Sequence, residues 1–195
     1  VMTGAGISTA SGIADYTRGD WLEPGVPLAT YNFLSFIHNR QSRIMYWNAC
    51  FRFFNVARRT RPNLAHTTLT TLQTAGLIKT VITQNVDRLH QRAGTERVIE
   101  LHGSIDHVHC LQCGAQQAWP ESGGWQDADV MCECGGFIKP AVIAFGEDIP
   151  RPNWEQAQQA VSTCNLMLVI GTQVAVTSAM ALIEQARLDR KSTRL

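Results

Sequence analysis

Short apolar runs alternate with helix-like stretches along this chain, and this alternation constrains the fold more than any other feature. Apolar runs of strand length occupy residues 1–3, 77–83, 98–101, 141–145 and 166–170. Helix-like stretches lie between or after them, at residues 66–75, 153–161 and 178–188. Near-continuous apolar strands that alternate with helices predict a parallel sheet covered on both faces, which is a doubly wound α/β fold.

The first apolar run leads directly into a glycine turn. Thr3 is followed by Gly4-Ala5-Gly6 and then by Ser8, a residue type that can start a helix. A strand, a Gly-x-Gly loop and a helix N-terminus form a cradle for a pyrophosphate, because glycines let the backbone approach and free helical N–H groups receive the charge. An ordinary tight turn has the same short pattern, so this motif alone leaves both interpretations open.

Polar side chains follow two of the predicted strands at the point where each strand ends. Asn85 and Asp87 come after the run at 77–83, and His102 comes after the run at 98–101. In an open α/β sheet, ligands bind at the carboxyl ends of the strands, so these side chains converge near the glycine loop. A histidine there can act as a general base at neutral pH. Taken singly, Asn85 and Asp87 are equally explained as turn caps and His102 as a core histidine.

Four of the six cysteines crowd into one short stretch. They are Cys110, Cys113, Cys132 and Cys134. A Cys-x₂-Cys pair and a Cys-x-Cys pair, separated by a ribbon-length gap, are close to a four-thiolate zinc ribbon, although the second pair is one residue short. Residues 106–139 are poor in aliphatic side chains and need a staple to fold. Because four thiolates leave no position for water, the pattern predicts one structural zinc ion. His107 and His109 are either surface histidines or substitute ligands.

Two other features are open to more than one interpretation. Residues 27–61 are aromatic, basic and helix-like, which fits either a helix pair packed in the core or the hydrophobic wall of a ligand cleft. The outlying Cys50 and Cys164 are most simply buried, inert thiols. The tail at 189–195 is either a charged terminus or a non-native sequence derived from an adapter.

Composition excludes few functions. The net charge of +1 gives no electrostatic argument for nucleic acid or a membrane surface. No apolar run approaches the length of a membrane span, and no signal peptide is visible. The chain starts inside a strand and stops before the last strand that a doubly wound fold needs. We therefore expect a fragment truncated at both ends.

Together these motifs resemble the sirtuins, the NAD-dependent protein deacylases. The matching motifs appear in the family's order along the whole chain, and their wording is nearest to the bacterial and mitochondrial branch. They are Thr3-Gly4-Ala5-Gly6-Ile7-Ser8, Ser11-Gly12-Ile13, Pro62-Asn63-x-Ala65-His66, Thr83-Gln84-Asn85-Val86-Asp87, Leu101-His102-Gly103, the four cysteines, Lys139-Pro140-x-Val142, Phe145-Gly146-Glu147 and Gly171-Thr172.

The resemblance implies a discontinuous two-domain organisation. A Rossmann-type NAD-binding domain would comprise residues 1–26, 62–105 and 140–188. A small domain would combine the helical insert at 27–61 with the zinc module at 106–139. NAD and an acyl-lysine peptide would meet in the cleft between the domains, with the peptide added as a strand.

The resemblance also implies a reaction. The acyl oxygen would attack C1′ of the nicotinamide ribose, and His102 would then act as general base toward a ribose hydroxyl. The products would be free lysine, nicotinamide and O-acyl-ADP-ribose. Asn85 would orient the ribose and a water, and Asp87, with Ile13, would hold the nicotinamide carboxamide.

The implied binding residues fall into two sets. The cofactor set is Gly4, Ala5, Gly6, Ile13, Asp15, Tyr16, Arg18, Gln84, Asn85, Asp87, Gly171 and Thr172. The acyl-lysine set is Val142, Phe145 and Gly146. The chain departs from the family pattern at Ala14, where proline is usual, at Thr17, which displaces the arginine by one residue, and at Gln173, where serine is common.

Two alternative functions stay open: protein ADP-ribosyl transfer, which shares the first half of the chemistry, and an NAD-binding module with little turnover. The expected partner is an acyl-lysine protein or peptide, with neither nucleic acid nor membrane. No tyrosine–arginine pair for acidic acyl groups is evident, which favours an apolar acyl chain. The expected location is cytoplasmic, or the mitochondrial matrix in a eukaryote.

Overall fold

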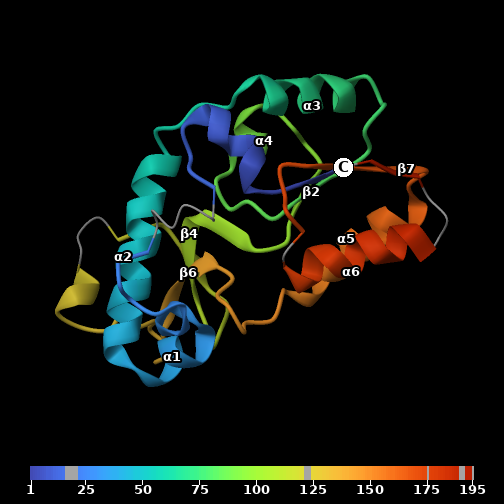
Figure 1. Ribbon diagram of the computed structural model, residues 1–195. Helices are drawn as coiled ribbons and strands as arrows, with labels where there is room; N and C mark the ends of the chain where they lie inside the picture. Colours follow the sequence, from blue (N-terminus) through green and yellow to red (C-terminus); the bar gives the residue numbers. More distant parts are fainter. Residues whose placement is uncertain (16–21, 121–123, 175, 189–191, 195) are drawn as a thin grey trace. The chain divides into compact units, whose positions relative to one another are not determined.

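The computed structural model describes residues 1–15, 22–120, 124–174, 176–188 and 192–194 (Figure 1). The chain divides into two compact units. The first comprises Val1–Arg18, Thr60–His102 and Ile149–Leu195, and the second comprises Gly19–Arg59 and Gly103–Asp148. Of the predicted cofactor residues, Tyr16 and Arg18 lie outside the described residues. No described helix has the length and apolar character that crossing a bilayer requires.

The first unit is built on a parallel sheet of five strands. Its order is β3-β2-β1-β7-β8, and each neighbouring pair runs parallel. The strands are β1 (Met2–Thr3), β2 (Val81–Thr83), β3 (Val98–Glu100), β7 (Leu166–Ile170) and β8 (Ser192–Arg194). This topology confirms the doubly wound α/β fold expected from the alternation of strands and helices.

Helices cover both faces of this sheet. In Figure 1, α3 (Leu64–Thr74) and α4 (Leu89–Arg92) lie on one side, and α5 (Arg151–Thr163) and α6 (Thr177–Leu188) lie on the other. The apolar sides of α5 and α6 pack on the strands in one aliphatic core. Its fully buried members include Met2, Leu101, Ala157, Ala179, Leu182 and Ala186.

Local signals explain where the helices begin. The Asn63 side chain accepts a hydrogen bond from the N–H of Ala65, and the N–H of Asn63 donates to Nδ1 of His66, which closes a capping box at the start of α3. Pro152 sits in the first turn of α5, where its missing N–H has no helical partner to lose. The sequence placed these helices within a few residues of their observed ends.

Three elements differ from expectation. The run at 77–83 becomes a strand only from Val81, and Leu77 is 75% exposed. The run at 141–145 does not join the parallel sheet: the strand there is β6 (Ile138–Val142), and it pairs antiparallel with β4 (Gly103–Cys110) in the second unit. The sequence did not single out residues 103–110 as a strand. They form β4, the longest described strand of that unit, and so provide the antiparallel partner of β6.

The third difference is at the end of the chain. No last strand was expected there, yet Ser192–Arg194 forms β8, parallel to β7 at the edge of the sheet.

The second unit combines helices with a small antiparallel sheet of order β5-β4-β6, in which β5 is Gln116–Gln117. Its α-helices are α1 (Phe33–His38) and α2 (Arg40–Ala57), and its short 3₁₀ turns are η3 (Leu28–Tyr31) and η4 (Gly124–Gln126). Strand β4 packs against α2 as well as against β6. The helical insert and the cysteine segment thus form one body.

An aromatic cluster forms the core of the second unit. Trp47 of α2 is 2% exposed; it stacks on Trp125 with ring centroids 5.2 Å apart and meets Trp119 edge-on at 5.4 Å. Phe54 stacks on Trp119 at 4.9 Å, and Phe51 lies 5.0 Å from Trp125. These rings belong to the core, which decides between the two interpretations of residues 27–61 for this part of the helix.

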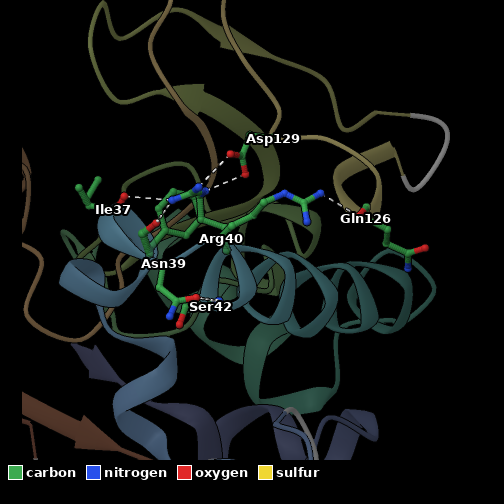
Figure 2. A network of polar contacts seen from close by, with 8 residues as sticks. Ile37, Asn39, Arg40, Ser42, Gln126 and Asp129 are labelled. Carbon is green, nitrogen blue, oxygen red and sulfur yellow. Dashed lines mark hydrogen bonds and ion pairs between the residues drawn. The ribbon is translucent and has the colours of Figure 1, made fainter.

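A partly buried ion pair, Arg43–Asp129, joins the same two segments. The Arg43 guanidinium donates to both carboxylate oxygens of Asp129 at 2.8 Å and to the carbonyls of Phe36 and Ile37 at 3.0 Å, which caps the end of α1. Figure 2 shows this network, in which Asp129 approaches from the cysteine segment and Arg40 reaches the carbonyl of Gln126. Bidentate pairing of this kind fixes geometry as well as charge.

Candidate active site

The carboxyl ends of four neighbouring parallel strands bring the predicted cofactor residues together in the first unit. Gly4 follows β1, Gln84 follows β2, and Gly171 follows β7. His102 lies two residues beyond the end of β3. Since the strand order is β3-β2-β1-β7, these residues form a continuous edge, where an open α/β sheet binds its ligands.

The glycine loop packs tightly against the end of β7. A Cβ added at Gly4 would lie 2.7 Å from Cβ of Thr172, and one at Gly6 would lie 2.9 Å from Cα of Gly171. The N–H of Gly6 donates to the carbonyl of Gly171 at 2.8 Å, and that of Ile7 donates to Gly4 at 3.1 Å. The glycines are needed here because two backbone segments touch, and the N–H groups of Gly6 and Ile7 are taken up by backbone carbonyls.

The loop continues into a 3₁₀ helix, η1 (Ala5–Ser11), which Ser8 does not cap as expected. Instead, the buried Ser8 hydroxyl donates to Oδ2 of Asp87 at 2.7 Å and accepts from Nδ2 of Asn85 at 3.1 Å. Asp87 also accepts the N–H of Leu89 at 2.9 Å. Asn85 and Asp87 are both buried, so the first glycine loop and the second strand end are locked together by side-chain hydrogen bonds.

Two buried histidines, His66 and His90, lie next to this network, with their ring centroids 4.9 Å apart. Nδ1 of His66 accepts the N–H of Asn63, so the neutral ring carries its proton on Nε2, which faces the Ser8 hydroxyl at 3.5 Å. The Thr3 hydroxyl donates to Thr83 and therefore accepts from Nε2 of His90 at 2.9 Å. Within the described part of the chain, Nδ1 of His90 has no hydrogen-bond partner.

Burial keeps these histidines neutral. It lowers the pKa of His90 to about 4, an effect to which His66 adds and which the Asp87 carboxylate opposes. Burial also lowers the pKa of His66. Both rings therefore serve as fixed hydrogen-bond partners near neutral pH.

His102 is held in one tautomer. Its Nδ1 lies 3.1 Å from the carbonyl oxygen of Gln84, which can only accept, so the proton sits on Nδ1 and Nε2 carries a lone pair. The Ser178 hydroxyl faces that lone pair at 3.3 Å. Burial lowers the pKa of His102, and the bond to Gln84 partly opposes this shift. A neutral imidazole with a defined basic nitrogen is what a general base requires.

The remaining cofactor residues of the first unit differ in their surroundings. Nε2 of Gln84 donates to the Thr172 hydroxyl at 3.0 Å, which links the ends of β2 and β7. Ile13 is buried, whereas Ala5 and Asp15 are half-buried. Gly171 is exposed and has φ +66°, a conformation that favours glycine.

The predicted acyl-lysine residues lie in the second unit: Val142 ends β6, and Phe145 and Gly146 lie in the loop after it. The Val142 carbonyl accepts the Tyr46 hydroxyl at 2.7 Å, and the Phe145 carbonyl accepts the N–H of Phe33 at 2.9 Å. The Phe145 side chain is 44% exposed, and Gly146 has φ +75°. The loop therefore has a fixed backbone and an exposed apolar side chain.

The four clustered cysteines fit a zinc ion. All four Sγ atoms lie within 4.8 Å of one another, with Cys110–Cys134 at 3.5 Å and Cys113–Cys132 at 3.7 Å. Tetrahedral coordination at about 2.3 Å would place the sulfurs about 3.8 Å apart. The N–H groups of Cys113 and Gln112 point at the Cys110 sulfur and lower the pKa of its thiol, which favours the thiolate that a metal needs.

Turn geometry explains why glycines follow each cysteine pair. Gly114 has φ +75° and Gly135 has φ +86°. A Cβ at Gly136 would lie 2.8 Å from the Cys110 sulfur. His107 pairs with Asp106 at 2.6 Å and does not join the sulfur cluster. Among the described residues, the donor set is thus four sulfurs.

The two outlying cysteines are not alike. Cys50 is buried, and burial raises the pKa of its thiol to about 12, which makes it inert as expected. Cys164 is only half-buried, and its thiol donates to the carbonyl of Val161.

The sequence missed several residues that shape the site. Four residues, Ser8, His66, His90 and Ser178, contact predicted site residues or their network. Ser8 was expected only to start a helix, and the other three had no assigned role. His66 stands in the Pro62-Asn63-x-Ala65-His66 motif and His90 lies three residues after Asp87; these positions were the only signal for them. Ser178 had none, since it lies far along the chain from His102.

Comparison with known proteins places the chain. The Sir2 family profile matches residues 4–178. An NAD-dependent protein deacetylase of Thermodesulfovibrio yellowstonii is 40% identical over 187 residues, covering 93% of this chain and 72% of the relative. NAD-dependent protein deacetylase 1 of Pyrobaculum aerophilum is 37% identical over 91% of this chain and 70% of the relative.

Solved structures agree with the sequence relatives. A crystal structure of a Sir2 homolog–NAD complex superimposes with a TM-score of 0.86 at 31% identity, covering 98% of this chain and 74% of that one. A complex of Sir2 with a p53 peptide and NAD⁺ gives a TM-score of 0.81 at 32% identity, with 98% and 78% covered. The chain belongs to the Sir2 family.

Proposed function

We propose that this chain is an NAD-dependent enzyme that removes acyl groups from protein lysine, giving nicotinamide and O-acyl-ADP-ribose. The observation that carries the proposal is the strand-end cluster of the first unit. There, Nε2 of His102 is unprotonated and faces the Ser178 hydroxyl, and Nδ1 is anchored on the carbonyl of Gln84, the residue next to Asn85. The names of the relatives support the same reaction class.

NAD, when bound, supplies a ribose C1′ that accepts the acyl oxygen, with nicotinamide as the leaving group. Nε2 of His102 takes a proton from a ribose hydroxyl, which makes that hydroxyl a nucleophile. Because burial lowers the pKa of His102, the ring is neutral and ready to accept that proton at pH 7.

Asn85 and Asp87 act as a fixed pair. Asp87 accepts from Ser8 and from the N–H of Leu89, so its carboxylate cannot turn away when a ligand binds. We assign it to the nicotinamide carboxamide, together with the buried Ile13. Asn85 orients the ribose and a water, and its amide is held by the Ser8 hydroxyl.

The dinucleotide lies along the strand ends. Gly4, Ala5 and Gly6, with Gly171 and Thr172, line it where two backbone segments meet, and Gln84 fixes Thr172 by a hydrogen bond. Asp15, Tyr16 and Arg18 complete the proposed cofactor set. Val142, Phe145 and Gly146 bind the acyl-lysine. The zinc ion has a structural role, because four sulfurs close its coordination sphere.

The substrate class is an acyl-lysine peptide. Similar solved structures hold a propionylated peptide and an acetylated peptide. We extend this to an apolar acyl chain, as the sequence indicated. Independence from nucleic acid and membrane, and the cytoplasmic or mitochondrial location, stay predictions.

Product analysis separates this function from its alternatives. The chain is incubated with NAD and an acetyl-lysine peptide, and the products are weighed by mass spectrometry. Bare lysine together with O-acetyl-ADP-ribose supports the proposal. A peptide that carries ADP-ribose would identify a transferase instead. NAD binding with neither product would leave only the binding module, the reading motivated by the departures at Ala14 and Thr17.

A further inference from the structure

A lysine is completely buried in the second unit, and the proposed reaction does not use it. The Lys139 side chain has 0% exposure and forms an ion pair with Oε2 of Glu147 at 2.8 Å. Its Nζ also donates to the carbonyls of Val142 at 2.5 Å and Pro140 at 3.2 Å. An ammonium has three protons, so these three acceptors satisfy it fully.

The partner carboxylate is engaged in the same loop. Oε2 of Glu147 accepts the N–H of Ala144 at 2.7 Å, and the N–H of Glu147 donates to the carbonyl of Ala144 at 3.1 Å. Tyr46 adds a hydrogen bond to the Val142 carbonyl, and its ring centroid lies 5.1 Å from Nζ of Lys139. Charge and backbone are thus tied together at both ends of the segment 142–147.

Burying this ion pair is an inefficient way to stabilise the fold. Burial disfavours the charged ammonium and lowers the pKa of Lys139, while the Glu147 carboxylate opposes that shift. Buried ion pairs often contribute no more stability than apolar residues of the same size, and their best-attested use is to select one conformation. The conformation selected here is that of residues 142–146, which include all three proposed acyl-lysine residues.

We propose that Lys139 and Glu147 are positioning residues that hold the 142–146 loop in the conformation that binds the acyl-lysine. They reach the substrate only through that loop: Lys139 fixes the Val142 carbonyl, and Glu147 fixes the N–H of Ala144. The identity of the ligand rests on the proposed function. The effect of the Lys139–Glu147 pair on the loop conformation does not depend on that function.

Glu147→Gln is the most informative variant. Its amide oxygen still accepts from Ala144 and its shape is kept, but the charge that faces Lys139 is lost. Asp129→Asn is the control, because it removes the acidic charge of another ion pair of the same unit, Arg43–Asp129, whose hydrogen bonds go to Phe36 and Ile37 rather than to residues 142–147. Lys139→Met tests the same pair from the other side.

Two readouts are taken on the full chain with its zinc. Amide hydrogen exchange of residues 142–147 reports the loop without any ligand. Steady-state kinetics report KM for an acetyl-lysine peptide, KM for NAD, and kcat. We expect Glu147→Gln to speed exchange in the loop and to raise the peptide KM about tenfold, with kcat and the NAD KM within about twofold of wild type. Asp129→Asn should leave both readouts at their wild-type values when each protein is measured at the same interval below its own melting temperature.

The outcomes separate the two claims. Unchanged exchange at 142–147 in both Glu147→Gln and Lys139→Met overturns the positioning role whether or not the chain is active. A lower kcat with equally raised KM values for peptide and NAD would also overturn it if Asp129→Asn had the same effect. Such a result would indicate general destabilisation. A wild-type chain without turnover contradicts the proposed function alone. Faster amide exchange in the variants would still establish that Lys139 and Glu147 hold the loop.

Discussion

The two units are stabilised and used in different ways. The first unit has an aliphatic core between a parallel sheet and its helices, and it concentrates buried polar groups at the strand ends. The second unit has an aromatic core, four clustered cysteines, one buried ion pair and one partly buried ion pair around a small antiparallel sheet. Burying aliphatic surface stabilises the first unit without any ligand, whereas the second unit depends on a metal and on a few large rings.

This difference teaches where function and stability can be separated. Polar side chains of the first unit, such as Ser178, contribute little to the aliphatic core, so changing them should alter activity more than folding. In the second unit, the residues that fold the chain also hold the loop that carries the acyl-lysine residues. The predictions below test that contrast, beginning with the largest effect.

Zinc removal should affect the second unit most. Structural zinc contributes about 10–16 kcal/mol of apparent binding free energy in zinc-finger peptides. Chelation, or Cys113→Ser, should abolish the near-ultraviolet circular dichroism of Trp119 and Trp125, while much of the helical signal remains. Metal analysis should find about one zinc per chain, and Cys164→Ser should keep it. A metal-free chain with an unchanged tryptophan signal would contradict the structural role.

Truncation of Trp47 should be the next largest effect. This side chain is 2% exposed and contacts two other tryptophans. Trp47→Ala should destabilise the second unit by about 3–5 kcal/mol, the range for large buried aromatic residues. Urea unfolding, monitored by the release of zinc, measures this loss of stability. Leu34→Ala is the control, because Leu34 is 65% exposed and should change little.

Acid should destabilise the first unit through His90. Its pKa is lowered to about 4 in the folded state, against about 6.5 in the unfolded chain. Between these values the unfolded chain binds a proton that the folded chain does not, so stability is full above pH 6.5 and falls toward pH 4. The shift corresponds to about 3 kcal/mol.

Urea midpoints at pH 7.5 and pH 4.5 measure this loss. His90→Gln should flatten the dependence, although burial of His66 leaves a smaller one of the same sign. An equal pH dependence in wild type and His90→Gln would show that the buried ring is not its source.

Ser178 should have the smallest effect. Its hydroxyl donates to Nε2 of His102 and so favours the neutral ring. Ser178→Ala should raise the pKa of His102 and move the acid limb of the kcat/KM profile to higher pH. Thr177→Ala, in the same turn, is the control. An acid limb that stays in place would remove Ser178 from the environment of the base.

The sequence predicted the first unit better than the second. Apolar runs and helical periodicity located β7 at its observed bounds and placed α3, α5 and α6 within a few residues, because local pattern decides elements that pack in a layered sheet. It misassigned residues 141–145, because the antiparallel partner β4 lies some thirty residues earlier and carries no apolar run. Pairing between distant segments leaves little local trace.

The site shows the same limit. The pattern located the strand ends and the four cysteines, since both depend on spacing along the chain. It could not show that Gly6 donates to Gly171, that Ser8 bonds Asp87, or that Ser178 faces His102, because these contacts join segments far apart in sequence. Lys139 and Glu147 stood in recognised motifs, but only their burial revealed an ion pair.

One measurement tests the central claim most directly: the rate of O-acyl-ADP-ribose formation from NAD and an acetyl-lysine peptide, compared between wild type and His102→Ala. General base catalysis contributes about 10²–10⁴-fold, so the account predicts a loss of O-acyl-ADP-ribose formation of that size with an unchanged melting temperature. His107→Ala, a histidine of the second unit, should keep full activity. Product formation by His102→Ala at the wild-type rate would contradict the account.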